Sequence, residues 1–222
     1  MKTTFKFIFL FLITFSVFTT YAQDHIPEWK NQLKFSPLRV VDPSNPGIEF
    51  SFERIHKKGF STMASVGLMQ DIFNFTDHID YSGIKLSLEE KYFFSVKNFK
   101  RFNAFQYAAM ELSYLEVDYN TSSLFIKDVF IGGPKYLDTF NIAKQNISVN
   151  FKYGVQVPLN RFLIDISAGI GFKHKSIERE GVLNRFAYEV VHKHPHIDDL
   201  HKKEGKYITF NFPFNIRIGY GF

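Results

Sequence analysis

The chain has no cysteine among its 222 residues and only one tryptophan. Without cysteine, no disulfide can hold the fold together. No run of 18 apolar residues occurs after the N-terminal segment, which excludes a bundle of membrane-spanning helices. A strong charge of one sign is also missing. The formal net charge is +5 and the charges are scattered, so nothing indicates a nucleic-acid partner.

The first 22 residues have the pattern of a secretory signal peptide. Lys2 and Lys6 form a charged start, Phe7–Phe18 is almost entirely apolar, and small residues precede Gln23. We expect cleavage after Ala22, give or take one residue, so that 23–222 is the mature domain. The alternative is an uncleaved anchor, but an apolar core of this length is far short of the ~20 residues that a spanning helix needs.

The last stretch, Lys206–Phe222, shows the clearest periodicity in the chain. From Ile208 onward every even position is apolar and most odd positions are polar or small. Alternation of this kind places the apolar side chains on one face of a strand. The stretch is long for a soluble strand but suits a tilted strand that crosses a bilayer, which needs about 9–11 residues in the lipid. It predicts the closing strand of a transmembrane β-barrel.

Seven further segments alternate in a similar way and are separated by turn residues. The sequence therefore predicts an all-β fold, a closed antiparallel eight-stranded transmembrane β-barrel. The expected strands are Gln32–Val41, Gly47–His56, Phe60–Met69, Ser82–Ser95, Asn103–Tyr119, Ile142–Val157, Phe162–Lys175 and Lys206–Phe222. Every second connection is short and the others grow longer. Outer-membrane barrels have short periplasmic turns and longer extracellular loops, so both termini are expected in the periplasm.

A secreted lipocalin-like barrel would show the same alternation with its apolar face turned inward. Two features favour the membrane barrel. Aromatic residues gather at strand ends, and the polar faces carry charges of both signs at mid-strand, where charges inside a narrow lumen must pair. The predicted lumen charges are Glu49, Glu53, Glu89, Lys91, Glu111, Lys152, Asp165, Lys173 and Arg217. We also expect Glu53 and Arg217 to meet directly or to be bridged by Lys91 or Lys152.

Several short motifs resemble the small eight-stranded outer-membrane proteins of Gram-negative bacteria, which share the plan of the OmpA transmembrane domain and OmpX. They are Tyr21-Ala22-Gln23, Glu53-Arg54, Gly83-Ile84-Lys85 and the terminal Arg217-Ile218-Gly219-Tyr220-Gly221-Phe222. The resemblance implies an outer-membrane location and contact with outer-membrane lipid and lipopolysaccharide. It also implies that the barrel-assembly machinery reads Tyr220 and Phe222 as an assembly signal. It implies no activity.

Two weaker constellations carry possible chemistry. His174, Ser176 and Glu178 match the residue types of an outer-membrane lipid A deacylase, with His as base, Ser as nucleophile and Glu as orienting group. His192, His194, His196 and His201 gather in one loop, where imidazoles can bind Zn²⁺ or Cu²⁺.

The interpretation we carry forward is a monomeric, non-enzymatic barrel without a cofactor. Its role is structural or in surface interactions, and charged side chains plug its lumen. A small pore and a lipid A-modifying hydrolase are the alternatives.

Overall fold

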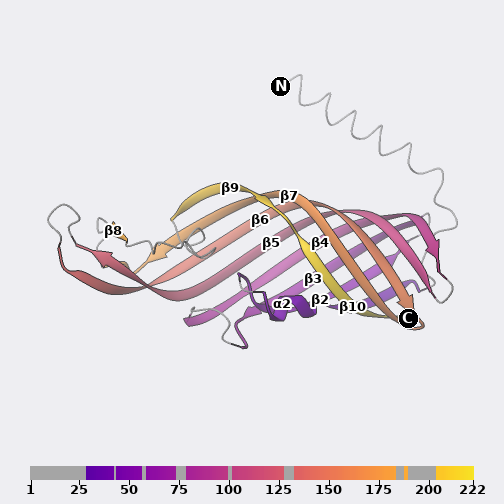
Figure 1. Ribbon diagram of the computed structural model, residues 1–222, viewed down its shortest axis with the longest axis horizontal. Helices are drawn as coiled ribbons and strands as arrows, with labels where there is room; N and C mark the ends of the chain where they lie inside the picture. Colours follow the sequence, from indigo (N-terminus) through magenta and orange to yellow (C-terminus); the bar gives the residue numbers. More distant parts are fainter. Residues whose placement is uncertain are drawn as a thin grey trace, which may run out of the picture.

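The computed structural model of the chain describes residues 29–42, 44–56, 59–73, 79–99, 102–127, 133–183, 188–189 and 204–222. Over these residues the fold is antiparallel β-sheet with one short helix (Figure 1). The elements are β1 (Asn31–Phe35), α2 (Pro37–Val40), β2 (Gly47–Ile55), β3 (Phe60–Gln70), β4 (Ile79–Asn98), β5 (Asn103–Ile126), β6 (Lys135–Leu159), β7 (Phe162–Glu180), β8 (Tyr188–Glu189), β9 (Gly205–Asn211) and β10 (Phe214–Gly221). The predicted signal peptide lies outside these residues.

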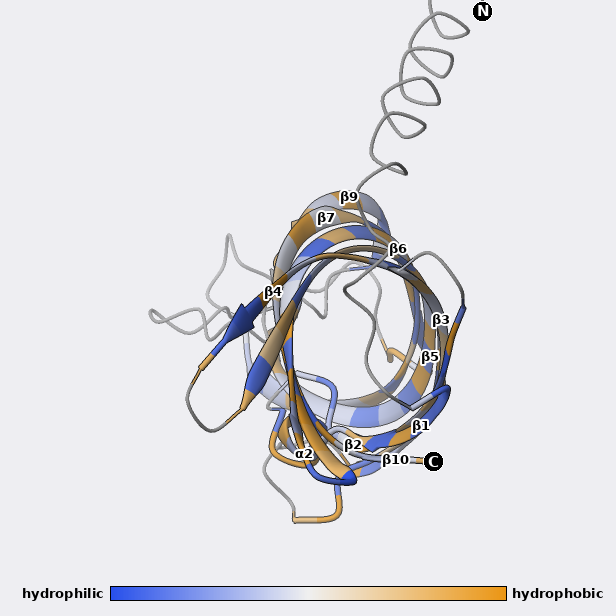
Figure 2. Cartoon of the chain, turned by 90° about the vertical axis from the view of Figure 1, so that its right-hand side faces the viewer, coloured by the Kyte–Doolittle hydropathy of each residue, from blue (hydrophilic) through white to orange (hydrophobic). Residues whose placement is uncertain are grey.

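Eight strands close into a ring. Each strand from β1 to β7 pairs with its neighbour in sequence, and β10 pairs with both β7 and β1. Viewed end-on, the ribbon encloses a round interior (Figure 2). The predicted all-β class and the ring of eight antiparallel strands are therefore confirmed.

The two faces of the ring differ in chemistry along every strand. On β2 the side chains of Glu49, Ser51 and Glu53 are buried inside the ring, whereas Phe50 and Phe52 between them are 60% and 42% exposed. The outward side chains along the strands are thus mainly apolar, and the buried inward ones include charged and polar residues together with two apolar clusters. This is the opposite of the lipocalin-like alternative, whose apolar face lines the interior.

The eighth strand is built from two segments that share one alternation. β9 pairs with β7, the chain breaks regular pairing at Phe212 and Pro213, and β10 continues along β7. Pro213 has no amide hydrogen to donate, but its carbonyl still accepts a hydrogen bond from the Gly169 amide at 2.9 Å. The even positions remain on the outer face throughout, as the sequence predicts.

The first strand is shorter than its alternation predicted. β1 ends at Phe35, because Pro37 occupies the first turn of α2, a position that proline favours. α2 therefore stands where the expected strand would have continued to Val41. This change leaves β1 paired with β10 over only four residue pairs, from Gln32 with Gly221 to Phe35 with Ile218.

The connections differ in length at the two ends of the ring. At one end they span residues 56–59, 99–102 and 160–161, and Asn160 adopts the left-handed conformation (φ 56°) that asparagine tolerates. At the other end β5 and β6 form a hairpin that extends well beyond its neighbours (Figure 1). Much of the loop predicted over Asn120–Asn141 is therefore strand. None of the described helices is long and apolar enough to span a membrane.

Candidate functional site

The interior of the ring holds a charge-balanced set of buried side chains. Five buried cations and five buried carboxylates form ion pairs with one another: Lys34, Lys85, Lys91, Lys152 and Arg217 with Glu49, Glu53, Glu89, Glu111 and Asp165. Lys144, Lys175 and Asp138 are buried as well but lie outside this set. An unpaired charge in a low-dielectric interior costs several kcal/mol, so such a set must pair internally. The ion pairs form three connected groups.

The first group joins five strands around Asp165. Lys34 of β1 and Lys91 of β4 both donate to Asp165 of β7, at 2.5 and 2.7 Å. The same two lysines donate to Glu53 of β2, Lys91 at 2.9 Å. Tyr107 of β5 also donates to Asp165, and Lys91 lies 4.5 Å from the centre of its ring. Two cations thus share two carboxylates across the ring.

The second group joins β4, β5, β6 and β10. Lys152 of β6 donates to Glu111 of β5 at 2.7 Å and also to Glu89 of β4. Arg217 of β10 reaches across to Glu89 at 3.4 Å and lies 3.9 Å from Glu111. Lys91, 3.8 Å from Glu89, links this group to the first. The strands are therefore tied to each other through the interior as well as along their edges.

The third group lies beside α2. Lys85 donates to Glu49 at 2.5 Å, and Arg39 of α2 lies 3.5 Å from the same carboxylate. Arg39 also donates to Asp42 at 2.8 Å. These contacts hold the helical turn against the inner wall of β2.

Aromatic side chains pack beside the charges toward the end with the short turns. Phe93, Phe105, Tyr107 and Ala109 form a buried cluster, and the rings of Phe93 and Tyr107 are 5.5 Å apart. Tyr107 belongs to this cluster and also donates to Asp165, so it connects the aromatic cluster to the first group of ion pairs. A larger apolar cluster lines the wall toward the long hairpin, and includes Met69, Val117, Tyr119, Phe140 and Ile142. Interior space is filled by side chains, as expected for eight strands.

Glu53 and Arg217 form no direct ion pair among the described residues, whereas Lys91, a predicted bridge, does bind Glu53. Glu53 lies opposite Gln32, which lies opposite Gly221, four residues from Arg217 along β10. Arg217 is instead the cross-strand partner of Asp165, and Lys34 and Lys91 each bind both Asp165 and Glu53. Lys91, one of the two predicted bridges, also lies 3.8 Å from Glu89, which lies 3.4 Å from Arg217.

Eight of the nine predicted lumen residues take part in these groups. Lys173 is on the inner face but is only half-buried, and it joins no ion pair among the described residues. Sequence reasoning missed Lys34, Lys85 and Tyr107. The two lysines were detectable, since they alternate with outward apolar residues, whereas an inward-facing tyrosine looks like any apolar position.

The three residues matched to a hydrolase lie on the outer face of β7. His174 is paired with Ile147, Ser176 with Gln145 and Glu178 with Ala143. Residues two apart on a strand have Cα atoms about 7 Å apart, so only side chains that lean toward each other can hydrogen-bond. Within the described chain, no hydrogen bond connects these three side chains.

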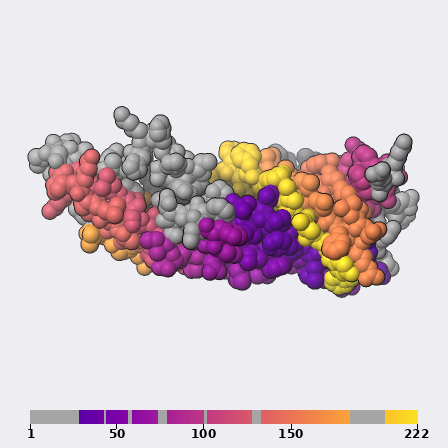
Figure 3. All heavy atoms as spheres, turned by 60° about the horizontal axis from the view of Figure 1, so that its bottom comes forward, coloured from indigo at the N-terminus to yellow at the C-terminus, as the bar shows by residue number. Residues whose placement is uncertain are grey.

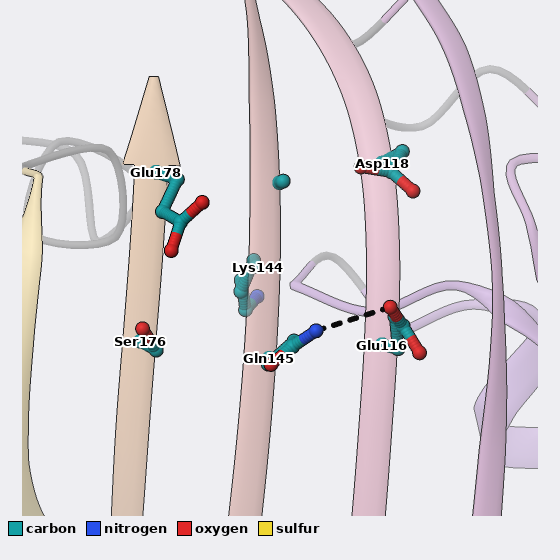
Figure 4. Close-up of a pocket in the computed structure, with 7 residues that line it drawn as sticks. Glu116, Asp118, Lys144, Gln145, Ser176 and Glu178 are labelled. Atoms are coloured by element: carbon teal, nitrogen blue, oxygen red, sulfur yellow. Dashed lines mark hydrogen bonds between the residues drawn. The ribbon is translucent and has the colours of Figure 1, made fainter. Parts of the chain in front are cut away.

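A shallow hollow of about 50 Å³ lies beside Ser176 and Glu178 (Figure 4). Gln145 there donates to Glu116 at 3.1 Å, and Tyr114 donates to the same carboxylate at 2.7 Å. These hydrogen bonds, the one from Tyr114 first, lower the pKa of Glu116. Ligand pockets usually measure about 300–1,000 Å³, so this hollow is too small to hold an acylated substrate.

The two remaining predicted sites are the histidine-rich loop and the C-terminal assembly signal. His192, His194, His196 and His201 lie outside the described residues, and within those described no cluster of three or more metal-ligating side chains occurs. At the C-terminus, the Phe222 backbone exchanges two hydrogen bonds with Asn31, and Tyr220 packs on Phe162. The aromatic side chains of both terminal residues face outward.

Comparisons with known proteins add little to this geometry. No family model and no curated protein matches the chain. Among solved structures, a major outer membrane protein from Thermus thermophilus is similar over 88% of this chain and 100% of that chain, with 9% sequence identity and a TM-score of 0.40.

Proposed function

We propose that the chain is an integral outer-membrane β-barrel protein without enzymatic activity, whose role is structural or in surface interactions. The observation that carries this proposal is an apolar belt around the outside of the ring. Cross-strand partners form one continuous outward row: Leu33, Phe52, Ala64, Leu88, Leu112, Val149, Phe172 and Phe210. Every one of them is exposed. A water-soluble monomer rarely exposes a contiguous apolar surface of this extent.

The height of the belt fits a bilayer. On β7 the outward positions are apolar from Phe162 to Phe172, and the next three are His174, Ser176 and Glu178. Those eleven residues match the ~9–11 that a tilted strand needs to cross the hydrocarbon region. Over the described residues of this region, the strands pair edge to edge except beside α2, and membrane-spanning sheets require such pairing.

The proposed orientation follows from the connections. The short turns and both termini lie at one end, which we assign to the periplasm, and the β5–β6 hairpin rises on the cell surface. We expect a monomer in contact with outer-membrane lipid and lipopolysaccharide. If the barrel-assembly machinery reads the last residues, Phe222→Ala slows assembly in cells without lowering the stability of the folded protein. A normal assembly rate of the Phe222→Ala variant would contradict recognition of the C-terminus by the barrel-assembly machinery.

The test of membrane placement uses the intact protein. We expect it in the outer-membrane fraction, with a shift in gel migration between unheated and boiled samples because a closed barrel resists detergent until it is heated. Full solubility without detergent, or migration that heating leaves unchanged, would overturn the proposal.

We further propose that the balanced charge groups plug the lumen. Each cation of these groups is paired with a carboxylate. None of these cations is therefore available to attract a permeating ion. We expect no steady conductance when the protein is inserted into a planar lipid bilayer. Variants that remove one partner, such as Arg217→Ala, are expected to flicker between closed and open levels.

A small pore is the second candidate, and one observation favours it. Five serines form a cross-strand row on the inner wall, Ser51, Ser65, Ser87, Ser113 and Ser148. Three of their buried hydroxyls, on Ser51, Ser65 and Ser87, have no hydrogen-bond partner in the described chain. Buried hydroxyls of this kind are usually hydrated. Steady conductance of the unmodified protein would favour this candidate over the plug.

A further inference from the structure

The wall of the ring has one place where a strand is missing. β1 ends at Phe35, while β10 and β9 continue along β7 back to Gly205. Beyond Ile218, the edge that faces β1 therefore has no strand partner in the described chain. The helical turn α2 stands beside this edge and packs against both β2 and β10. Figure 3 shows the yellow C-terminal strand running beside the indigo N-terminal segment.

A cavity of about 250 Å³ lies between α2 and β10 and reaches both faces of the wall. Phe214 and Ile216 are outer-face residues, whereas Ser36 and Asn215 are buried on the inner side. The cavity is lined by Ser36, Leu38, Arg39, Val41, Asp42, Phe214, Asn215 and Ile216. Its volume is near the lower end of the ~300–1,000 Å³ usual for ligand pockets, which suits one chain of a lipid better than a whole molecule.

The lining has an apolar part and a charged part. Leu38, Val41, Phe214 and Ile216 are its apolar part, and Arg39 and Asp42, with side chains 20% and 24% exposed, are its charged part. In an antiparallel strand alternate residues direct their amide and carbonyl groups to the same side, so part of the β10 backbone faces this cavity. Exposed backbone is costly in hydrocarbon, which makes an amphiphilic occupant more favourable here than pure hydrocarbon.

The charges around the cavity favour an anion. Arg39, Lys85 and Lys173 are near α2 on the inner side, against Asp42 and Glu49, which leaves one positive charge in excess. Lys173, which lies beyond the Phe172 end of the belt, makes no ion pair within the described residues. Burial, and then the charge of Arg39, lower the pKa of Lys173. A nearby anion would relieve this repulsion.

We propose that the unpaired edge of β10 together with α2, which we call the seam, binds an anionic phospholipid. One acyl chain lies in the cavity between α2 and β10, and the phosphate lies near Arg39 and Lys173. The inference rests on the proposed membrane placement. It assigns the seam a lipid class, whereas the rest of the outer wall contacts lipid without selecting it.

The absence of cysteine permits a direct test by single-site labelling. Leu38→Cys carries a fluorophore in the seam, and Val149→Cys carries it on the outer face of β6, well away from α2. The full chain is placed in phosphatidylcholine vesicles that contain nitroxide-labelled phosphatidylglycerol or nitroxide-labelled phosphatidylcholine. We expect the Leu38 label to be quenched about fivefold more effectively by the anionic lipid, the preference that one basic side chain near a membrane provides. The Val149 label should show no preference.

Two substitutions sharpen the test. Arg39→Gln should abolish the preference at Leu38, and Ile216→Trp should fill the cavity and reduce quenching there. Ile166→Trp is the matched control, because Ile166 is the cross-strand partner of Ile216 but does not line the cavity. A label at Val41→Cys repeats the measurement if the change at Leu38 disturbs α2.

The possible failures are distinguishable. Equal preference at Leu38 and Val149 would overturn lipid selection by the seam. An unquenched Leu38 beside a quenched Val149 would show that lipid does not enter, and energy transfer between two labelled copies would then identify a second chain there. If Val149 is itself unquenched, the membrane placement fails, and the seam proposal fails with it.

Discussion

The inner and outer faces of the ring are made by the same strands but are stabilised by opposite means. On β4, Leu86 and Leu88 are 43% and 50% exposed, while Lys85 and Glu89 beside them are buried. The outer face needs only apolar character, so its side chains are interchangeable. The inner face needs particular partners at particular distances. Substitutions on the two faces should therefore differ in size and in how they depend on the solvent.

The largest effect is expected inside. Arg217→Ala leaves Glu89 and Glu111 without one of their cations and should cost about 3–5 kcal/mol of unfolding free energy. Glu89→Ala should be similarly costly. The double variant should cost less than the sum by ~0.5–3 kcal/mol, because the two side chains interact. Urea unfolding in detergent micelles measures the cycle.

A second cycle with Glu53→Ala is the control for the register of the ring. Glu53 makes no direct contact with Arg217 among the described residues and is joined to it through shared partners, so its coupling to Arg217 should be smaller than that of Glu89. Equal coupling in both cycles would mean that the linked groups respond to the loss of Arg217 as one unit.

The next effect tests the outer face. Leu112→Lys places a charge in the middle of the belt and should cost ~2–4 kcal/mol of folding free energy in lipid vesicles. Glu116→Lys, on the same face of the same strand, should cost less than ~1 kcal/mol, since exposed charges are well solvated. Equal costs would contradict the proposed upper boundary of the belt.

A glycine on the inner wall offers a smaller, steric test. A Cβ on Gly154 would overlap the ring of Tyr107, so Gly154→Ala must displace the tyrosine that donates to Asp165. Overpacking of this kind typically costs about 1–3 kcal/mol. In a Tyr107→Leu background the same change should be nearly neutral. An undiminished penalty there would show that another neighbour causes it.

The smallest effect concerns pH at the inner wall above the belt. Burial, and then the charge of Lys173, lower the pKa of Lys175 to about 8. The unfolded chain then binds more protons than the folded one between about pH 8 and 10.5, so the contribution of Lys175 to stability rises with pH in that window. Lys175→Met should stabilise the protein at pH 7 by about 1 kcal/mol, a value discounted for solvent screening.

The measurement for Lys175 is the difference in melting temperature between wild type and Lys175→Met. That difference should shrink as pH rises from 7 to 10. A difference that does not change with pH would mean that the lysine is stabilised by an anionic partner as strongly as it is disfavoured by burial.

Much of the ring was predictable because strand alternation is a local property. The period of two in Gly47–Ile55 or Phe214–Gly221 needs no knowledge of any other strand, and it identified the inward charges Glu49, Glu53 and Arg217 correctly. The same reasoning placed His174, Ser176 and Glu178 together on the outer face of β7. It was unable to show that no hydrogen bond joins these three side chains within the described chain.

The sequence by itself determined the number of strands in the ring, the chemistry of their two faces and the short turns at one end. Only the tertiary structure decided which charges pair, because pairing depends on the stagger of eight strands, which places Asp165 and not Glu53 opposite Arg217. It also decided where β1 stops. Pro37 favours a helical turn, which ends β1 at Phe35. The seam is open because β10 and β9, which pair with β7, continue beyond the point where β1 ends.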